Sequence, residues 1–304
     1  MTPVKQKFLA ICGILTTALV WGLMWYPFRS LNQGGVSVAT TSLVVYLVAI
    51  ALGLITFFDV YRRQFRWQPV LLLLAAVFGW CNYSYTWAVS EGQVVRVLLL
   101  FYLSPLWTVF LSRLILKERL TGSGWLVVAL SLLGSFIFIY RPGLFDGELP
   151  LSHRYEWLAL SGGMAFALGN VLSRNARGIP VPVKSASIWF GVASIGAIKL
   201  ALAGQLGGIL EIPPQSWLVL GILGVTLLCT SVISQHGVSI LPATQTMTLM
   251  LMELLFAAAS AYLLAGEAMT SREWLGGALI ASASLLSGRM SAKPVTAQLK
   301  QEAA

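Results

Sequence analysis

Glu253 is the only acidic residue of this chain that lies near the middle of a long apolar stretch. An ionised carboxylate at the centre of a membrane costs at least about 2.5 kcal/mol, so such a side chain should face a cavity or a partner. In a cavity it would exchange protons or hold a cationic ligand group. Between packed helices it would be a structural carboxyl, protonated or hydrogen-bonded. Both interpretations stay open, and Glu253 is the first candidate for a functional site.

Pro105 lies near the middle of another long apolar stretch, directly after Ser104. A proline in a helix removes one backbone donor and leaves a carbonyl without its usual partner. Such a break can form a binding site or a hinge, and the alternative is a plain packing kink. Tyr102 lies three residues earlier and falls close to Pro105 on one helical face. We therefore expect Tyr102 and Pro105 either to line a cavity or to mark a kink.

Aromatic and polar residues gather at 80–87, near the end of a third apolar stretch. Asn82, Tyr85 and Thr86 fall together at helical spacing. Asn82 lies deeper in the stretch, and both Asn82 and Tyr85 are candidates for the wall of a ligand cavity. Ordinary packing is the alternative for both residues. Trp87 lies nearer the end, where aromatic residues commonly anchor a span at the membrane surface.

Trp21 and Trp25 are four residues apart, which places both rings on one helical face. Two such rings can form a cage for a quaternary cation, and packing or anchoring at the membrane surface is the alternative. The second half of the chain supplies neutral hydrogen-bonding groups at the corresponding place. These further cavity candidates are Asn170, Ser231, Ser234 and Gln235. Side chains of this kind also serve as ordinary contacts between helices.

The composition is that of a membrane protein with many spans. The chain has 304 residues, of which 57% are hydrophobic and 10% are charged. Soluble domains carry about 25% charged residues, so this chain lacks the charges for a water-exposed surface. Its net charge of +9 is divided among short groups between apolar runs, whereas a nucleic-acid-binding protein gathers its basic residues on one face. The expected partner is therefore the lipid bilayer and not a nucleic acid.

The sequence lacks the motifs of metal sites, ATP sites and intramembrane proteases. Cys12, Cys81 and Cys229 lie in apolar stretches without a Cys-x-x-Cys spacing. The two histidines, His153 and His236, are far apart and form no His-Glu-x-x-His sequence. A Gly-x4-Gly-Lys-Ser/Thr motif for ATP is also absent. We expect neither a metal nor a cofactor, and an intramembrane enzyme is the least favoured function.

Ten stretches of the chain have about the 20 residues that a helix needs to cross a membrane. They are 8–26, 36–57, 69–89, 94–115, 123–140, 156–173, 185–206, 216–235, 242–265 and 273–290. Turn residues such as Pro and Gly mark many of the short junctions between them. The predicted fold is all-α, with ten transmembrane helices. The polar residues 291–304 are expected to form a disordered cytoplasmic tail.

The distribution of Lys and Arg predicts the direction of the chain, because cytoplasmic loops carry an excess of both. With the N-terminus inside, 14 of these residues fall on the cytoplasmic side and 6 on the other side. Both termini are then cytoplasmic, and the protein is expected in the inner (plasma) membrane. Arg96 and Lys199 fall inside predicted spans near the external end, and we expect them to extend toward the membrane surface.

Matching residues recur at a constant displacement along the chain. Glu118 corresponds to Glu267 (267 − 118 = 149), and Trp125 corresponds to Trp274 (274 − 125 = 149). Five spans per half is an odd number, so the second half must enter the membrane from the opposite side. We therefore predict two inverted five-helix repeats. The predicted division is 1–141 for the first repeat, 142–155 for an external linker and 156–290 for the second repeat.

Ten spans in two such halves resemble the drug/metabolite transporter superfamily and, within it, the EamA-like members. The motifs that carry the resemblance are Leu103-Ser104-Pro105-Leu106, Leu116-Lys117-Glu118-Arg119-Leu120-Thr121, Leu241-Pro242-Ala243, Met252-Glu253-Leu254, Gly266-Glu267 and Trp274-Leu275-Gly276-Gly277-Ala278-Leu279-Ile280. Repeats of this family often carry a Glu-Pro pair midway through the fourth helix. Here Ser104-Pro105 stands in the first half and Glu253-Leu254 in the second, so each half keeps one member of the pair.

The resemblance implies a secondary transporter that works by alternating access. Its substrate would be a small metabolite that is exported, such as an amino acid or an amphipathic toxic compound. Proton coupling through Glu253 is a hypothesis that depends on a single intramembrane carboxylate. A channel or a structural membrane subunit is the alternative. Neither the substrate nor the oligomeric state follows from the sequence.

Overall fold

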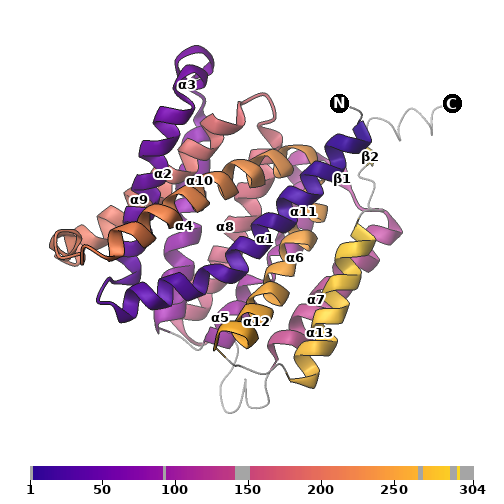
Figure 1. The fold of residues 1–304 in the computed structure, drawn as a ribbon. Coiled ribbons are helices and arrows are strands. Elements are labelled where there is room, and N and C mark those ends of the chain that lie inside the picture. Colours follow the sequence, from indigo (N-terminus) through magenta and orange to yellow (C-terminus); the bar gives the residue numbers. More distant parts are fainter. Residues whose placement is uncertain (1–2, 92–93, 141–150, 266–269, 288–292, 295–304) are drawn as a thin grey trace.

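The chain folds into a bundle of helices, shown in Figure 1. The computed structural model describes residues 3–91, 94–140, 151–265, 270–287 and 293–294. The first half forms α1 (Pro3–Gln33), α2 (Val38–Thr56), α3 (Phe58–Gln64), α4 (Pro69–Glu91), α5 (Val94–Phe101), α6 (Ser104–Leu111), the π-helical turn η1 (Ser112–Leu116) and α7 (Gly122–Ile139). The second half forms α8 (Arg154–Asn175), α9 (Val181–Leu202), the 3-10 turn η2 (Leu206–Ile209), α10 (Ser216–Ile240), α11 (Ala243–Met250), α12 (Met252–Ala265) and α13 (Ser271–Ser287).

The two ends of the bundle are built differently. One end, which we call the terminal face, holds the start of α1 and the short strands β1 (Glu118–Arg119) and β2 (Lys293–Pro294), as Figure 1 shows. The two strands pair antiparallel. The opposite end, where α1 ends at Gln33 and α4 ends at Glu91, is the loop face. Within the predicted tail, 293–294 are the described residues, and this pairing holds them against β1.

Seven stretches of the described chain are long and apolar enough to cross a membrane. They are Val4–Gln33, Val38–Thr56, Pro69–Ala88, Gly122–Ile139, Val181–Leu202, Ser216–Ile240 and Ala243–Leu264. Large apolar side chains such as Leu202 (85% exposed) and Leu285 (84% exposed) stand on the outside, where lipid contact explains them. The prediction of an all-helical membrane protein with several spans is therefore confirmed. The number of ten stays a prediction, because α13 has 17 residues against the roughly 20 of a full crossing.

The span predicted at 94–115 is not one continuous helix. It is divided at Tyr102 between α5 and α6, and η1 completes it. Pro105 stands in the first turn of α6, directly after this break. A proline is tolerated in a first turn because the N–H groups there have no helical partner. The span thus breaks beside its proline, and the role of this break as a binding site or a hinge stays a prediction.

The span predicted at 242–265 is also interrupted, although it contains no proline after its first residue. The break is at Leu251, between α11 and α12, where the backbone N–H of Leu254 bonds the Leu251 carbonyl at 3.1 Å. This bond spans three residues, as in a 3-10 turn, and replaces the four-residue spacing of an α-helix. The two breaks correspond at the displacement of the repeat (251 − 102 = 149).

The helix α4 packs along both α8 and α9. It meets α9 in direct backbone contact, because a Cβ atom at Gly191 would lie only 2.0 Å from the Ala75 carbonyl oxygen. A side chain larger than that of glycine cannot fit at such a crossing. The polar residues near the loop-face end of α4 are thereby held between both halves of the chain.

Candidate functional site

The two helix breaks meet at a pair of side chains. The hydroxyl group of Tyr102, at the first break, lies within hydrogen-bonding reach of the Glu253 carboxyl group. Glu253 lies in the first turn of α12, just after the second break, where the positive end of the helix dipole favours a carboxylate. Tyr102 is 9% exposed and Glu253 is partly buried. We call these two residues and the adjoining breaks the break site.

Aromatic rings from α4 and α5 flank the break site. The rings of Tyr85 and Phe101 are 4.9 Å apart, and Phe101 also meets Tyr102 edge to face at 5.7 Å. Tyr85 lies within electrostatic reach of Glu253. The structure therefore brings together three of the predicted cavity residues, Glu253, Tyr102 and Tyr85. Pro105 is buried in the adjoining turn, where it shapes the break and offers no hydrogen-bond donor.

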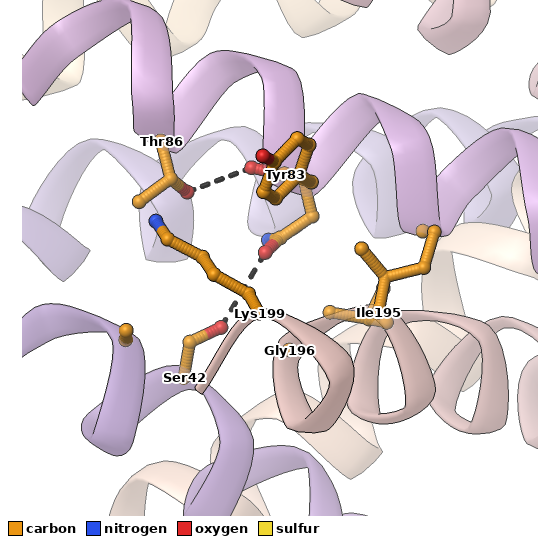
Figure 2. A pocket seen from close by; sticks show the side chains of 10 residues that line it. Ser42, Tyr83, Thr86, Ile195, Gly196 and Lys199 are labelled. Carbon is orange, nitrogen blue, oxygen red and sulfur yellow. Dashed lines mark hydrogen bonds between the residues drawn. The ribbon is translucent and has the colours of Figure 1, made fainter. Parts of the chain in front are cut away.

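Asn82 lines a small pocket between α2, α4 and α9, shown in Figure 2. Its side-chain oxygen accepts a hydrogen bond from Ser42 at 3.4 Å, and its backbone carbonyl accepts one from Thr86 at 2.7 Å. The Lys199 ammonium lies 5.5 Å from the centre of the Tyr83 ring. Lys199 thus turns toward α4, where an aromatic face attracts a cation.

Trp21 and Trp25 have different partners, although both stand on α1. The ring nitrogen of Trp25 donates to the hydroxyl group of Ser260 at 2.8 Å, which joins α1 to α12. Trp21 packs against an apolar cluster that includes Met24 and Leu227. These contacts fit the packing interpretation, and a cavity role for both tryptophans stays a prediction. The side chain of Arg96 lies outside the described part of the structure.

Two predicted polar residues of the second half are held by protein groups. Asn170 is buried and donates its amide to the Phe166 carbonyl one turn earlier, at 2.8 Å. Ser231 accepts a hydrogen bond from the ring nitrogen of Trp189, also at 2.8 Å. Ser234 has no side-chain hydrogen bond to any other described residue. Among the described residues no hydrogen bond joins any of the three to the break site, and their role as cavity residues stays a prediction.

Gln235 belongs to a buried polar network near the terminal face. Its side-chain oxygen accepts a hydrogen bond from the hydroxyl group of Ser173. Lys184 is 0% exposed and donates to the Ser173 carbonyl at 3.0 Å and to the hydroxyl group of Ser239. The sequence places Lys184 in a loop, one residue before a predicted span. Its burial was missed because a lysine beside a span normally reaches water.

Arg174 extends this network across the two halves of the chain. Its Nε donates to Oε1 of Glu118 at 2.7 Å, and a terminal nitrogen donates to the Leu241 carbonyl. The side chains of Arg174 and Glu118 are 6% and 13% exposed. In the sequence, Glu118 stands out only as an end-marker of the first repeat. Its contact with Arg174 is visible only in the structure. Its counterpart Glu267 lies outside the described residues.

Gln245 is a further buried polar residue that no sequence pattern singled out. It stands on α11, is 0% exposed, and neither its amide nitrogen nor its amide oxygen has a partner among the described residues. An unpaired buried amide is costly. The signal in the sequence that could have identified this residue was a glutamine within an apolar span.

Comparison with known sequences decides the family. The profile of the EamA-like transporter family matches residues 8–140 and 153–289, which is nearly the whole chain. The chain belongs to the EamA-like transporter family. The resemblance inferred from the sequence motifs is therefore confirmed, and this EamA-like protein is a membrane transporter by family.

Relatives of this EamA-like protein include two uncharacterized transporters. The protein of Archaeoglobus fulgidus is 26% identical over 91% of this chain and 95% of its own length. The protein of Pseudomonas aeruginosa is 27% identical over 58% of this chain, and the match spans only 57% of its length. The fold also matches a solved crystal structure with a TM-score of 0.73, at 17% identity over 91% of this chain and 96% of that one. At that identity the likeness shows the fold alone.

Proposed function

We propose that this EamA-like protein is a secondary active transporter that exports a small metabolite by alternating access. The substrate class that we propose is an amino acid or an amphipathic toxic compound. The protein would lie in the inner membrane with the terminal face in the cytoplasm. The excess of Lys and Arg on that side supports this direction.

The observation that carries the proposal is the approach of the Tyr102 hydroxyl group to the Glu253 carboxyl group. It joins two helices that break at corresponding positions, which is where transporters with inverted repeats bind substrates and coupling ions. Two halves that are related by inversion can rock about such a centre. The Arg174–Glu118 contact then closes the cytoplasmic end while the loop face is accessible.

Proton coupling is part of the proposal and depends on Glu253. A carboxyl group near the centre of a membrane is stable when it is neutral or paired, and it becomes costly when it is ionised alone. Tyr102 and the start of α12 offer partners to the ionised form. Binding of a proton and binding of a cationic substrate group would therefore compete at the same carboxyl group.

The test is transport by the purified protein in proteoliposomes. A thermal-shift screen over amino acids, purines and cationic drugs first selects a ligand. Counterflow of that ligand across the vesicles is then measured from pH 5.5 to 8.5. A carrier accelerates uptake of labelled ligand when the vesicles are preloaded with unlabelled ligand, whereas a channel shows no such acceleration.

The variants in this test are Glu253→Gln and, as a matched control, Glu211→Gln. Glu211 is exposed after η2, so its change should leave exchange intact. We expect Glu253→Gln to abolish the pH dependence of exchange. Proton coupling through Glu253 is rejected if this variant transports like the wild type at every pH. The absence of counterflow for every ligand that binds would reject the carrier itself and favour a channel or a structural subunit.

A further inference from the structure

The pocket beside Asn82 opens where three helices separate. Near the middle of the bundle, α4 and α9 touch at Gly79 and Gly191, since a Cβ atom at Gly79 would lie 2.7 Å from the Gly191 carbonyl oxygen. Toward the loop face the helices leave a hollow, lined by Ala39, Ser42, Gly79, Asn82, Tyr83, Thr86, Val192, Ile195, Gly196 and Lys199. The crossing thus closes the end of the pocket that points away from the loop face.

The groups without partners in the pocket are hydrogen-bond donors. The Lys199 ammonium is held over the Tyr83 ring and has no ion pair or hydrogen bond to any other described residue. The side-chain NH2 group of Asn82 likewise donates to no described residue, whereas both oxygens of Asn82 already accept hydrogen bonds, from Ser42 and Thr86. None of the ten lining residues is acidic. Free donors and one positive charge are what a carboxylate requires.

The direction of the Lys199 side chain supports the same conclusion. Lys199 lies three residues before the end of α9, so an extended side chain could reach the membrane surface. Figure 2 shows it in the hollow instead, among Ser42, Tyr83 and Thr86. None of the residues that line the hollow neutralises Lys199, so its charge is available to an anionic ligand.

We infer that this pocket binds the carboxylate group of the transported substrate, with Lys199 and Asn82 as its donors. The cavity measures about 20 Å³, which holds little more than one water molecule. The cavity is thus too small for a whole substrate. Only the anionic head group enters it, and the remainder of the ligand extends through the open mouth. The inference relies on the proposed transport function for the ligand to be a substrate.

The pocket and the break site both adjoin the loop-face half of α4. Asn82 and Thr86 face α2 and α9, while Tyr85, three residues after Asn82, faces Phe101 and lies within reach of Glu253. Both sites therefore draw on the same stretch of α4, from Asn82 to Thr86.

Binding of matched ligand pairs tests the inference in detergent solution, where no transport is needed. The probes are L-leucine against L-leucinamide, L-phenylalanine against L-phenylalaninamide, and benzoate against benzamide, measured by calorimetry. We expect the wild type to bind at least one carboxylate more tightly than its amide. Lys199→Gln should lose about tenfold or more of that preference, and Lys199→Arg should retain most of it.

Two further variants distinguish an effect on the pocket from the effect of a general loss of positive charge. Arg272 also lies over a tyrosine ring, at 5.8 Å from the centre of Tyr140, but it is outside the pocket, so Arg272→Gln should bind like the wild type. Asn82→Asp places a carboxylate beside Lys199 and should abolish the preference while the variant keeps its monodisperse elution. A folded Asn82→Asp variant that binds carboxylates normally would overturn the inference, even if Lys199→Gln failed to fold.

Anionic lipid head groups are the other source of the same chemistry. Repeating the titrations in nanodiscs of phosphatidylcholine alone and with added phosphatidylglycerol separates the two sources. Binding of the soluble probes in phosphatidylcholine alone would support the substrate assignment, and the absence of any such binding would overturn it. Carboxylate binding that depends on Lys199 but is not followed by counterflow would instead reject the transport function and leave the pocket assignment intact.

Discussion

Arg174 of the second half holds Glu118 of the first half, with its Nε 2.7 Å and a terminal nitrogen 2.6 Å from the same carboxylate oxygen. The second carboxylate oxygen of Glu118 is buried without a partner among the described residues. Arg177 lies 4.0 Å from the bonded oxygen. The contact therefore concentrates two guanidinium groups on one side of a single carboxylate, at the end of the bundle where the two halves meet.

Removing the carboxylate should destabilise the protein. Glu118→Gln leaves Arg174 mostly buried and without its counter-ion, and breaking a buried ion pair in this way costs about 3–5 kcal/mol. We expect a lower melting temperature of the purified variant in detergent. Glu211→Gln, an exposed acid replaced by the same amide, should melt like the wild type.

Replacing both partners separates charge from packing. The double variant Glu118→Gln with Arg174→Met removes the carboxylate and the guanidinium together, so no charge is left buried alone. Such pairs can often be replaced with little loss of stability. A double variant that melts below Glu118→Gln would contradict this account and show that the Arg174 contact with the Leu241 carbonyl matters more.

Tyr102→Phe tests the hydrogen bond of the break site without removing the aromatic ring. The ring contact with Phe101 can stay, while the Glu253 carboxyl loses a donor. A hydrogen bond to a charged group contributes about 1.5–3 kcal/mol, so we expect exchange in proteoliposomes to slow by about tenfold or more. Tyr262→Phe, on the exposed side of α12, should not change the rate. Equal rates for the wild type and Tyr102→Phe would remove the hydroxyl group from the mechanism.

Ser260→Ala should loosen the contact between α1 and α12. Ser260 is 5% exposed, accepts from the Trp25 ring and donates to the Gly22 carbonyl at 2.9 Å. Its loss leaves a partly buried donor unpaired, at about 1–3 kcal/mol. Thermal melting should therefore fall below that of Ser282→Ala, because Ser282 is exposed and bonds only within its own helix. Identical melting of the two variants would count against the contact.

The sequence predicted the all-helical membrane fold, and it singled out several residues of the break site. A charged residue in an apolar span and a proline in another are visible without a structure, which is why Glu253 and Pro105 stood out. Their partner Tyr102 could be placed near Pro105 by helical spacing. Its bond to Glu253 could not be predicted, because it joins residues 151 positions apart (253 − 102 = 151). Contacts between helices depend on the packing of the whole bundle.

The positions of the basic residues near the ends of predicted spans could not be predicted from the sequence. The positive-inside rule counts Arg174 and Lys184 as cytoplasmic loop charges, yet both are buried in the structure. A lysine side chain is long enough to reach either water or the interior, so its position along the chain does not decide which. Lys184 bonds Ser173, and Lys199 turns to Tyr83, because the neighbouring helices supply partners there.

Gly163 tests whether the close approach of α8 to the break site is needed for transport. A Cβ atom at Gly163 would lie 2.4 Å from the Phe101 carbonyl oxygen, one residue before Tyr102. Gly163→Ala must therefore displace α5, and with it the hydroxyl group that bonds Glu253. We expect both a lower melting temperature and slower counterflow.

The matched control for this change is Gly221→Ala in α10. A Cβ atom at Gly221 would meet nothing within 4 Å, and alanine is favoured over glycine within a helix by about 1 kcal/mol. This variant should melt at the same temperature as the wild type or slightly higher, and it should transport normally. If Gly163→Ala behaves like Gly221→Ala in both assays, α8 does not pack against the break as tightly as described. A loss of melting temperature with unchanged counterflow would instead show that the break tolerates displacement, and that the geometry around Tyr102 is less restrictive than we infer.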